Sequence, residues 1–381
     1  MTYELIIIGA GVWGCSAALK AKEMGVSSVL LIEARNGVAQ ESSAKAGGIV
    51  TDLVWHEEDI AWVQQSRHQY EKASVMSGDA SILQRYGMLT LAHPDRTGLL
   101  QQRALGLKER GIAASLWDHR HIATAYPELD RVSHQVTALW TPGDFHVNPT
   151  AYCEAVFRQS RDLGLQAALG TRVSRIARDG THLRLWMGQD VLNARRILIT
   201  AGTWTRKLTR TAGIDIPLRP YRAQLASLDF PHGYHLPMVW ELSTDVYLVP
   251  DGPHNLLAGD GTRLSEHDPD NYQTSGDDPF ISSIAGHVLD LTSRAEQAGL
   301  RTAWAGLCGG TPDRRPLVGP VADGLFVAAG DQGFGIMRGP AIASLAAQIA
   351  MGEADAPHLD PLRTSAHDFD IRPGFTLETE I

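Results

Sequence analysis

Residues 4–33 read ELIIIGAGVWGCSAALKAKEMGVSSVLLIE, and this stretch decides the fold. The apolar run of residues 4–8 is typical of a strand buried on both faces of a parallel sheet. A G-x-G-x-x-G turn follows directly, and the small residues after it predict a helix that packs closely on the sheet and is capped by Gly25. Residues 27–32 form a second apolar run that ends at Glu33. We therefore expect a strand–turn–helix–strand unit followed by an acidic side chain.

Each part of this unit has a role in binding a dinucleotide. Gly9 permits the tight turn, Gly11 lets a pyrophosphate approach the backbone, and Gly14 lets the helix touch the strand. The N–H groups at the start of the helix hold the phosphate. Glu33, about 20 residues after the glycines, accepts both ribose hydroxyls of an adenosine and would repel a phosphorylated ribose. The unit predicts a site for NAD or FAD.

A second glycine-rich segment follows this unit. After a turn at residues 34–37, residues 41–50 are small and polar, with two adjacent glycines. Such a segment can place its backbone and hydroxyl groups against the pyrophosphate and the ring of a long cofactor. We favour this interpretation over an ordinary surface loop.

Length and composition limit the class of protein. A chain of 381 residues predicts two domains, or one domain with a large insertion. The net charge of −9, with no basic run, argues against nucleic acid or an anionic membrane as the main partner. Cys15, Cys153 and Cys308 are far apart and lack metal-ligand spacing, which predicts free thiols and no structural zinc. Without a signal peptide or a run of ~20 apolar residues, we expect a soluble, cytoplasmic protein.

Beyond residue 50 the pattern alternates between two architectures. Helices are expected over residues 59–76, 98–110, 150–163, 281–299 and 341–351. Buried strands that end in glycine are expected over residues 196–202 and 325–330, as in the opening unit. Residues 217–261 instead show short strands separated by Pro and Gly, which predicts a mostly antiparallel sheet. Loops are expected over residues 140–149, which lead into the helix at 150–163, and over residues 306–313, which close onto the ligand.

These segments predict a fold of α/β plus α+β type with two domains. A discontinuous Rossmann-type cofactor domain would comprise residues 1–54, 146–208 and 302–358. A substrate domain built on the antiparallel sheet would comprise residues 55–145 and 209–301, and residues 359–381 would form a C-terminal tail. NAD-binding Rossmann domains are more often continuous, so the interrupted arrangement favours FAD.

The order and spacing of these motifs resemble the D-amino acid oxidase family of FAD-dependent oxidoreductases, which includes glycine oxidase and sarcosine oxidase. The resemblance spans nearly the whole chain. It rests on the opening turn with Glu33, Ser42-Ser43 through Gly47-Gly48-Ile49, Val173, Ala201-Gly202-Thr203-Trp204, Tyr247-Leu248-Val249-Pro250, Thr311-Pro312-Asp313 with Pro316 and Gly319, and Ala329-Gly330 with Gly333-Phe334-Gly335-Ile336.

The resemblance implies FAD as the cofactor and a set of residues that hold it. Glu33 would hold the ribose, Val173 would meet adenine through its backbone, and Trp204 would shield the cofactor. The turn at residues 331–337 would lie beside the flavin, where a helix N-terminus stabilises the negative charge of the reduced ring. The expected cofactor-binding residues are Gly9, Gly11, Val12, Trp13, Gly14, Glu33, Ala34, Arg35, Ser42, Ser43, Lys45, Ala46, Gly47, Gly48, Val173, Ala201, Gly202, Trp204, Cys308, Gly330, Gln332, Gly333, Phe334, Gly335, Ile336 and Met337.

The implied reaction is the oxidation of an amine or amino acid of the glycine, sarcosine or D-amino-acid type. The carbon that bears the nitrogen gives a hydride to flavin N5, and the imine product hydrolyses. No protein nucleophile or metal is required, so His56, His146 and His235 are interpreted as surface or structural residues. Oxygen or another acceptor would reoxidise the flavin, and both homo- and hetero-oligomers stay open.

The chain departs from the family pattern where a substrate carboxylate would bind. Glycine-oxidase-like members usually carry an arginine at the position of Cys308, and sarcosine-oxidase-like members carry a lysine near Met337. The expected catalytic residues are Tyr247, which matches a tyrosine that contacts the carboxylate, Arg338 as a shifted anchor, and Cys308. Arg222 is a further candidate anchor. The alternatives are that Tyr247 packs across strands, that the arginines form salt bridges, or that the substrate lacks an α-carboxylate.

Cys308 has two interpretations. It is a small free thiol in the space that the arginine vacated, or it forms a thioether to the flavin, as in some sarcosine-oxidase relatives whose spacing to Thr-Pro-Asp is longer. Three functional alternatives also stay open. They are the oxidation of a hydroxy acid or biosynthetic intermediate on the same fold, a flavin-carrying subunit of a hetero-oligomeric dehydrogenase, and an NAD-dependent enzyme.

Overall fold

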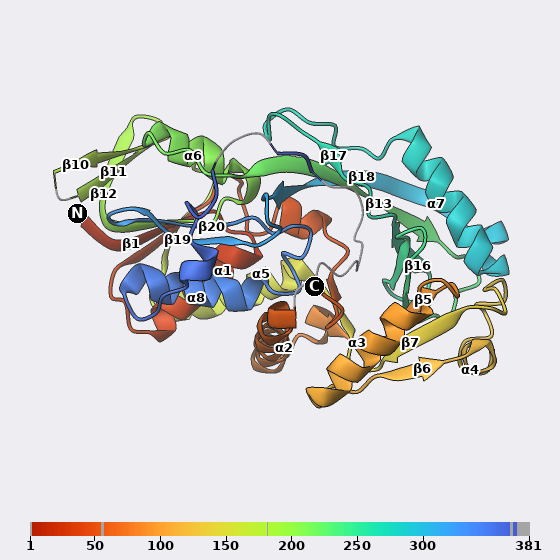
Figure 1. The fold of residues 1–381 in the computed structure, drawn as a ribbon. Coiled ribbons are helices and arrows are strands. Elements are labelled where there is room, and N and C mark those ends of the chain that lie inside the picture. Colours follow the sequence, from red (N-terminus) through yellow and green to blue (C-terminus); the bar gives the residue numbers. More distant parts are fainter. Residues whose placement is uncertain (1, 55–56, 181, 366–368, 372–381) are drawn as a thin grey trace.

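The structure is a computed structural model that describes residues 2–54, 57–180, 182–365 and 369–371. Two lobes lie side by side, one built on an eight-stranded sheet and the other on a nine-stranded sheet (Figure 1). A small sheet of three strands accompanies them: β3 (Ile49–Val50), β4 (Leu83–Gln84) and β8 (Phe145–Val147).

The opening unit folds as the sequence predicts. β1 (Thr2–Ile8) leads through the glycine turn into α1 (Val12–Glu23), and β2 (Val29–Ile32) pairs in parallel with β1. Gly9 has a φ of +105°, and a Cβ at Gly14 would lie 1.7 Å from the carbonyl oxygen of Gly9. Only glycine therefore fits at these two positions, because the turn is left-handed and the helix touches the strand.

The first sheet has the order β10-β11-β12-β1-β2-β9, with β20 beside β12 and β19 beside β20. Alternate residues of β1 belong to two different hydrophobic clusters, so both faces of the strand are buried. This explains its uninterrupted apolar sequence. The remaining strands are β9 (Gln166–Ala168), β10 (Arg175–Asp179), β11 (His182–Met187), β12 (Asp190–Ile199), β19 (Leu317–Ala322) and β20 (Leu325–Ala329).

Helices pack against this sheet and against one another. α1 contacts α5 (Pro149–Asp162) and α8 (Gly339–Met351), α2 (Glu57–Ser77) packs on α5 and α8, and α6 (Thr205–Thr211) packs on β10. The side chain of Asn148 caps α5 by accepting the N–H groups of Thr150 and Ala151, each at 3.1 Å. Small residues on α1 and α8 allow the close contact between them.

The second sheet has the order β17-β13-β16-β15-β14-β5-β7-β6, with β18 paired to β13. Within this second sheet, only the β14–β5 pairing is parallel among the described strands, so the mostly antiparallel prediction is confirmed. α7 (Asp278–Leu291) packs on β13 and β16, while α3 (Thr97–Glu109) and α4 (His119–Ala125) pack on β6 and β7. The strands are β5 (Met88–Ala92), β6 (Ser115–Trp117), β7 (Thr137–Thr141), β13 (Arg219–Asp229), β14 (Met238–Glu241), β15 (Tyr247–Pro250), β16 (Asn255–Gly259), β17 (Leu264–Ser265) and β18 (Gly299–Gly310).

Three predictions of local structure need correction. Residues 306–310, expected in a loop, form the end of β18, because pairing with β13 satisfies their backbone groups despite the glycines. The loop expected over residues 140–149 contains the end of β7 and all of β8. The expected helix over residues 281–299 ends at Leu291 and is followed by the short helix η4 (Ser293–Gln297).

Two elements, β18 and α2, cross the expected division into domains. The boundary at residue 302 falls inside β18, which is hydrogen-bonded to the second sheet along its length. α2, expected in the substrate domain, packs instead on helices of the first lobe. The four other short helices are η1 (Ser42–Lys45), η2 (Ala80–Ile82), η3 (Gly202–Trp204) and η5 (Pro357–Leu359).

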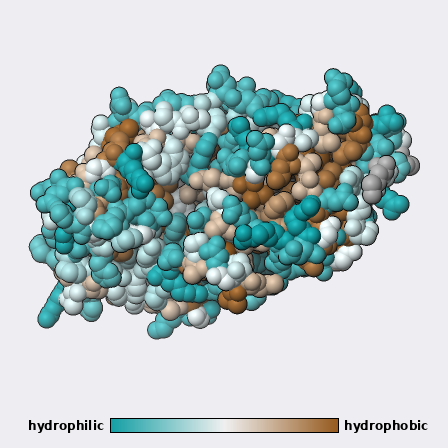
Figure 2. All heavy atoms as spheres, turned by 180° about the vertical axis from the view of Figure 1, so that it is seen from behind, coloured by the Kyte–Doolittle hydropathy of each residue, from teal (hydrophilic) through white to brown (hydrophobic). Residues whose placement is uncertain are grey.

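Seen from behind, the molecule presents mostly hydrophilic residues, with apolar residues gathered in patches between them (Figure 2). No helix in the described ranges is both long and apolar enough to cross a membrane.

Candidate active site

A cavity of about 490 Å³ lies between the two main sheets. Its first wall is formed by residues at the C-terminal ends of β1, β2, β12 and β20, where open α/β sheets bind their ligands. Its second wall is formed by β13, β15 and β18 of the other sheet. A ligand in this cavity is therefore held between a dinucleotide-type edge and a covering antiparallel sheet.

Most of the residues expected to bind the cofactor line this cavity. They are Gly9, Gly11, Val12, Trp13, Glu33, Ala34, Arg35, Ser42, Ser43, Lys45, Ala46, Gly47, Val173, Ala201, Gly202, Trp204, Cys308, Gly330, Gly333, Gly335 and Ile336. Tyr247 lines it as well. The residues expected at the site that do not line it are Gly14, Gly48, Gln332, Phe334, Met337 and Arg338.

The side chain of Glu33 is fixed by the backbone at one end of the cavity. Its Oε2 accepts the N–H of Ala10 at 2.7 Å, and its Oε1 accepts the N–H of Arg35 at 2.8 Å. Each carboxylate oxygen keeps lone-pair capacity for a further donor, such as a ribose hydroxyl. Nearby, the Oγ of Ser43 accepts the N–H of Val12 at 3.1 Å, which ties the second glycine-rich segment to the start of α1.

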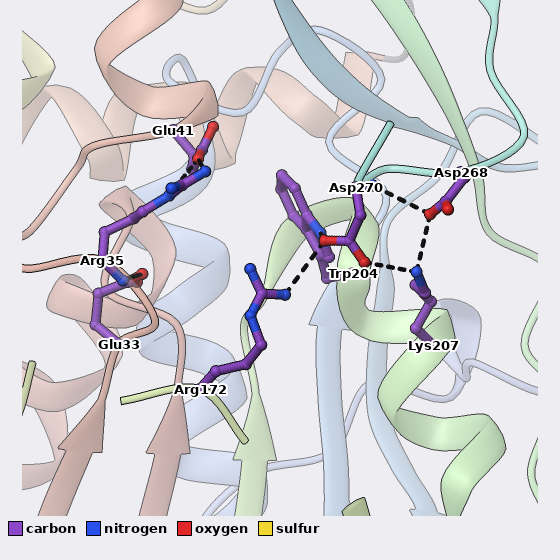
Figure 3. A network of polar contacts seen from close by, with 8 residues as sticks. All are labelled: Glu33, Arg35, Glu41, Arg172, Trp204, Lys207, Asp268 and Asp270. Carbon is purple, nitrogen blue, oxygen red and sulfur yellow. Dashed lines mark hydrogen bonds and ion pairs between the residues drawn. The ribbon is translucent and has the colours of Figure 1, made fainter. Parts of the chain in front are cut away.

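Opposite Glu33, a network of polar contacts joins the two lobes (Figure 3). Lys207 donates to Asp268 at 2.8 Å and to Asp270 at 2.6 Å. The indole of Trp204 donates to Asp270 at 2.8 Å, and Arg172 pairs with the same carboxylate at 3.2 Å. Because Asp268 and Asp270 lie between β17 and α7, this segment bridges from the antiparallel sheet to the other side of the cavity.

The turn at residues 330–337 forms the opposite end of the first wall. Trp13 donates to the carbonyl of Gly335 at 2.9 Å, and Tyr70 donates to that of Ile336 at 2.7 Å, so α1 and α2 hold the turn. Asp331 accepts the N–H groups of Gly309 at 2.6 Å and Gly333 at 3.0 Å. Burial nevertheless raises the pKa of Asp331. The turn leads directly into α8, whose N-terminus favours negative charge.

The second wall is a single face of the antiparallel sheet. Tyr221 is directly opposite Cys308, and Ala223 is directly opposite Gly306. Directly paired residues project to the same face. A Cβ on Gly306 would lie 3.1 Å from the Cβ of Lys45, so the glycine lets Lys45 pack closely against the sheet, and the small Ala223 lines the cavity beside it. Tyr247 lies on β15 beside this opening. Burial raises the pKa of the Tyr247 hydroxyl above its usual range.

The structure does not bring Arg338 into the cavity, contrary to the expectation of a substrate anchor. Arg338 is fully buried and forms an ion pair with Asp59 of α2. The neighbouring Gln332, Phe334 and Met337 are likewise turned into the protein, and the Nε2 of Gln332 donates to Thr311 at 2.6 Å. The turn thus exposes one set of residues to the cavity and packs the other set beneath it.

Arg222 also lies away from the cavity. It follows Tyr221 on β13 and therefore projects to the opposite face, where it pairs with Glu266 at 3.3 Å and with Asp277 at 3.5 Å. Gly48 lies against Val147 of β8 rather than in the cavity. Arg222 and Gly48 were expected at the site from the sequence, but neither faces the cavity.

Several cavity residues were not predicted. Tyr221, Arg263, Arg172, Lys207 and Asp270 all line it. Lys207 follows Trp204 by three residues, so helical spacing alone would have placed it beside that residue. Arg263 and Asp270 lie in connections between secondary-structure elements, and no sequence pattern marks them.

The other residues singled out from the sequence are three histidines and Cys308. His146 is buried in β8, and burial lowers its pKa, which keeps the imidazole neutral. His235 lies outside the cavity, and His56 falls outside the described residues. Burial, followed by the Asp331 carboxylate, raises the pKa of the Cys308 thiol well above its usual range. Among the described residues, no group of three or more His, Cys, Asp and Glu side chains is placed to hold a metal ion.

The residues present fit an FAD molecule. A Cβ at Gly11 would lie 2.9 Å from the Oγ of Ser43, so the backbone there is open to a phosphate only because no side chain intervenes. The carboxylate of Glu33 is poised at the ribose end, and the N-terminus of α8 adjoins the ring end. Fold and cavity together define an oxidoreductase of the dinucleotide-binding class.

The comparison with known proteins identifies the family. Residues 4–349 match the family described as FAD dependent oxidoreductase, and the chain belongs to it. FAD is the cofactor of this family, in agreement with the site.

Relatives are similar over nearly the whole chain. The 4-methylaminobutanoate oxidase (formaldehyde-forming) of Paenarthrobacter nicotinovorans is 26% identical, over 95% of this chain and 46% of its own length. The glycine oxidase of Bacillus subtilis is 22% identical, over 92% of this chain and 94% of its own. The chain spans about half the length of some curated relatives, and the 4-methylaminobutanoate oxidase is one of them.

A solved structure confirms the fold. The L-proline dehydrogenase of P. horikoshii superposes with a TM-score of 0.86, at 21% identity, covering 95% of this chain and 97% of that one.

Proposed function

We propose that this enzyme oxidises an amine or an amino acid at the carbon that bears the nitrogen. The observation that carries the proposal is the cavity itself, which has an FAD cradle on one wall and a covering sheet with small central residues and flanking tyrosines on the other. Two relatives, the glycine oxidase and the 4-methylaminobutanoate oxidase, are named for nitrogen-bearing substrates.

The expected residue roles follow the geometry of the first wall. Glu33 would hold the adenosine ribose, the turn at residues 9–14 and Ser43 would hold the pyrophosphate, and the turn at residues 330–336 would face the flavin ring. Segments of residues 1–54, 146–208 and 302–358 would supply this domain, with β18 shared with the substrate domain. Bound FAD would supply the two-electron acceptor that oxidation at the nitrogen-bearing carbon needs, and water would hydrolyse the imine product.

The covering sheet orients the substrate and excludes water. Ala223, Gly306 and Tyr247 line the same cavity as the turn at residues 330–336 and would bound the space for a substrate. The high pKa of Tyr247 keeps its hydroxyl neutral, so it can donate a hydrogen bond at physiological pH. The N-terminus of α8 stabilises negative charge that develops on the ring side of the cavity.

The visible spectrum of the purified protein under anaerobic conditions tests this proposal. Glycine, sarcosine, D- and L-amino acids, secondary amines and 2-hydroxy acids are added in turn. Bleaching of the band near ~450 nm by a nitrogen-bearing compound is the expected result. Bleaching by 2-hydroxy acids alone, or by none of the compounds, would replace the proposal with a hydroxy-acid or partner-dependent dehydrogenase.

The electron acceptor and the assembly are part of the same proposal. We expect oxygen or another small acceptor to reoxidise the flavin, and a homo-oligomer or hetero-oligomer in the cytoplasm. Turnover of the purified chain alone, with formation of hydrogen peroxide, supports an oxidase. Turnover only with an added partner protein supports a dehydrogenase subunit instead.

A further inference from the structure

Arg263 lies in the connection between β16 and β17 and lines the cavity, although only 8% of its surface is exposed. Its guanidinium carbon is 5.2 Å from the centre of the Tyr221 ring, over which it lies. One of its Nη atoms is 3.5 Å from the carbonyl oxygen of Gln332, in the turn that faces the cofactor side. A buried cation is thus held between the covering sheet and this turn.

The strand register explains how Arg263 comes to lie near Cys308, the position at which glycine-oxidase-like proteins usually carry an arginine. Tyr221 is directly opposite Cys308 on one neighbouring strand and directly opposite Ser265 on the other. Arg263 precedes Ser265 by two residues, so in extended backbone it projects to the same face as Tyr221 and Cys308. The guanidinium also lies close enough to Cys308 to influence its ionisation. An arginine from the other edge of β13 therefore reaches the side of the cavity where the small thiol leaves space.

The hydroxyl of Tyr221 is a second polar group on this side of the cavity. Tyr221 is 1% exposed, and its hydroxyl lies near the thiol of Cys308, a weak hydrogen-bond partner, without making a hydrogen bond of good geometry to any described residue. Buried hydroxyl groups are nearly always hydrogen-bonded, so a ligand atom is the natural partner of this one. The Arg263 guanidinium lies over the ring that carries this hydroxyl, so the two groups can donate to the two oxygens of one carboxylate.

We propose that Arg263 and Tyr221 form the subsite that holds the carboxylate of the substrate. This inference rests on the proposed function and narrows it, because the substrate is then an amino acid rather than a simple amine. Arg263 replaces the arginine that is absent at position 308, and Arg338 takes no part because it is buried in an ion pair with Asp59.

Binding of carboxylates to the FAD-loaded protein tests the subsite without turnover. Acetate, methoxyacetate and benzoate are titrated while the spectrum of the oxidised flavin is followed, and the matching amides serve as uncharged probes. Arg263→Met is expected to raise the Kd of the carboxylates roughly 10- to 100-fold, the range for lost hydrogen bonds to a charged group, and to leave the amides unchanged. Tyr221→Phe, which keeps the ring, is expected to raise the carboxylate Kd roughly 3- to 10-fold.

Arg222→Met is the matched control. Arg222 is the next residue to Tyr221 on the same strand and is buried to a similar extent as Arg263, but it projects to the other face. Its FAD-loaded form is expected to bind carboxylates as the parent does. Equal carboxylate affinity in the parent and in Arg263→Met, or FAD loss in Arg263→Met with Tyr221→Phe unchanged, would overturn the subsite. The second outcome would mean that Arg263 serves the cofactor.

Anaerobic reduction separates the failure of this subsite from the failure of the proposed function. Sarcosine is compared with dimethylamine, and proline with pyrrolidine, in the parent and in Arg263→Met. Preference for the amino acid of each pair, lost in Arg263→Met, supports the subsite. Reduction by the amines without a carboxylate, equal in both proteins, overturns the subsite and leaves the function standing. Carboxylate binding that depends on Arg263, with no reduction by any amine, supports the subsite and contradicts the function.

Discussion

Arg338→Met is expected to destabilise the protein without weakening substrate binding. Arg338 is 0% exposed, and its ion-pair partner Asp59 is also buried. A second Nη contact reaches the carbonyl oxygen of Asp331 at 3.4 Å, and the guanidinium lies 5.8 Å from the ring centre of Phe334. Methionine fills most of this space, but it leaves the Asp59 carboxylate buried without its cation.

The size of the effect follows from that uncompensated charge. Removing one partner of a buried ion pair costs roughly 3–5 kcal/mol, against a total of roughly 5–15 kcal/mol for a folded protein. Replacing both partners, as in Asp59→Asn with Arg338→Met, removes the charge as well. The double variant is therefore expected to recover much of the loss, with a coupling of at least ~1 kcal/mol between the two sites.

Urea unfolding followed by tryptophan fluorescence measures these differences at one fixed FAD concentration, since bound cofactor adds to stability. Arg184→Met is the control, because Arg184 pairs with Asp179 at 2.6 Å on the surface, where the two side chains are 48% and 54% exposed. It is expected to change stability by no more than ~1 kcal/mol. If Arg338→Met were as stable as this control and instead raised the KM for an amino acid, Arg338 would be a substrate anchor and the reasoning would be refuted.

Three further predictions concern single residues. Gly14→Ala is expected to abolish FAD binding and folding, because the new Cβ would lie 1.7 Å from the Gly9 carbonyl oxygen. Gly286→Ala is the control: it lies in the exposed part of α7 with nothing within 4 Å and should stabilise the protein by ~1 kcal/mol. Flavin content and the unfolding temperature are measured for both variants. Burial lowers the pKa of His146 in the folded chain, so as pH falls through ~6.5 the unfolded chain binds a proton more readily than the folded chain. Between pH 7 and 5.5 the parent should therefore lose more stability in urea unfolding than His146→Gln, by at most about 1.4 kcal/mol per pH unit, and equal losses contradict this. The raised pKa of Cys308 disfavours the nucleophilic thiolate, so denaturation should release all flavin, and flavin that stays on the chain would establish the thioether.

The cofactor half of the site was predictable from local sequence. Apolar runs, glycines and an acid at fixed spacing specify the strand–turn–helix unit, and Glu33 takes its position from the strand that precedes it. Asn148 and Pro149 likewise mark the start of α5 through capping and a fixed φ. In each case, the interactions that decide the structure lie within a few residues of one another.

The substrate half was not predictable in the same way. Arg338 and Arg222 were candidates because a substrate carboxylate needs a cation. Their orientation is set instead by ion pairs, of Arg338 with Asp59 and of Arg222 with Glu266 and Asp277, and these partners are distant in the sequence. Arg263 was missed because its position follows from the register of three strands, and no local pattern encodes that register. The glycines at the end of β18 concealed a strand for the same reason.

The lobe built on the first sheet is completed late in synthesis, because its first and last elements are far apart in the sequence. β1 and α1 leave the ribosome first, but β20, which pairs with β12, and α8, which packs on α1, are made roughly 300 residues later. At about 5–20 residues per second this delay is roughly 15–60 s. Throughout that time α1 lacks its native contact with α8, although α5, which also packs on α1, has already been made. The wall of the cavity formed by β20 and the turn before α8 is therefore completed only late in synthesis, and a chain that stops before β20 lacks this wall.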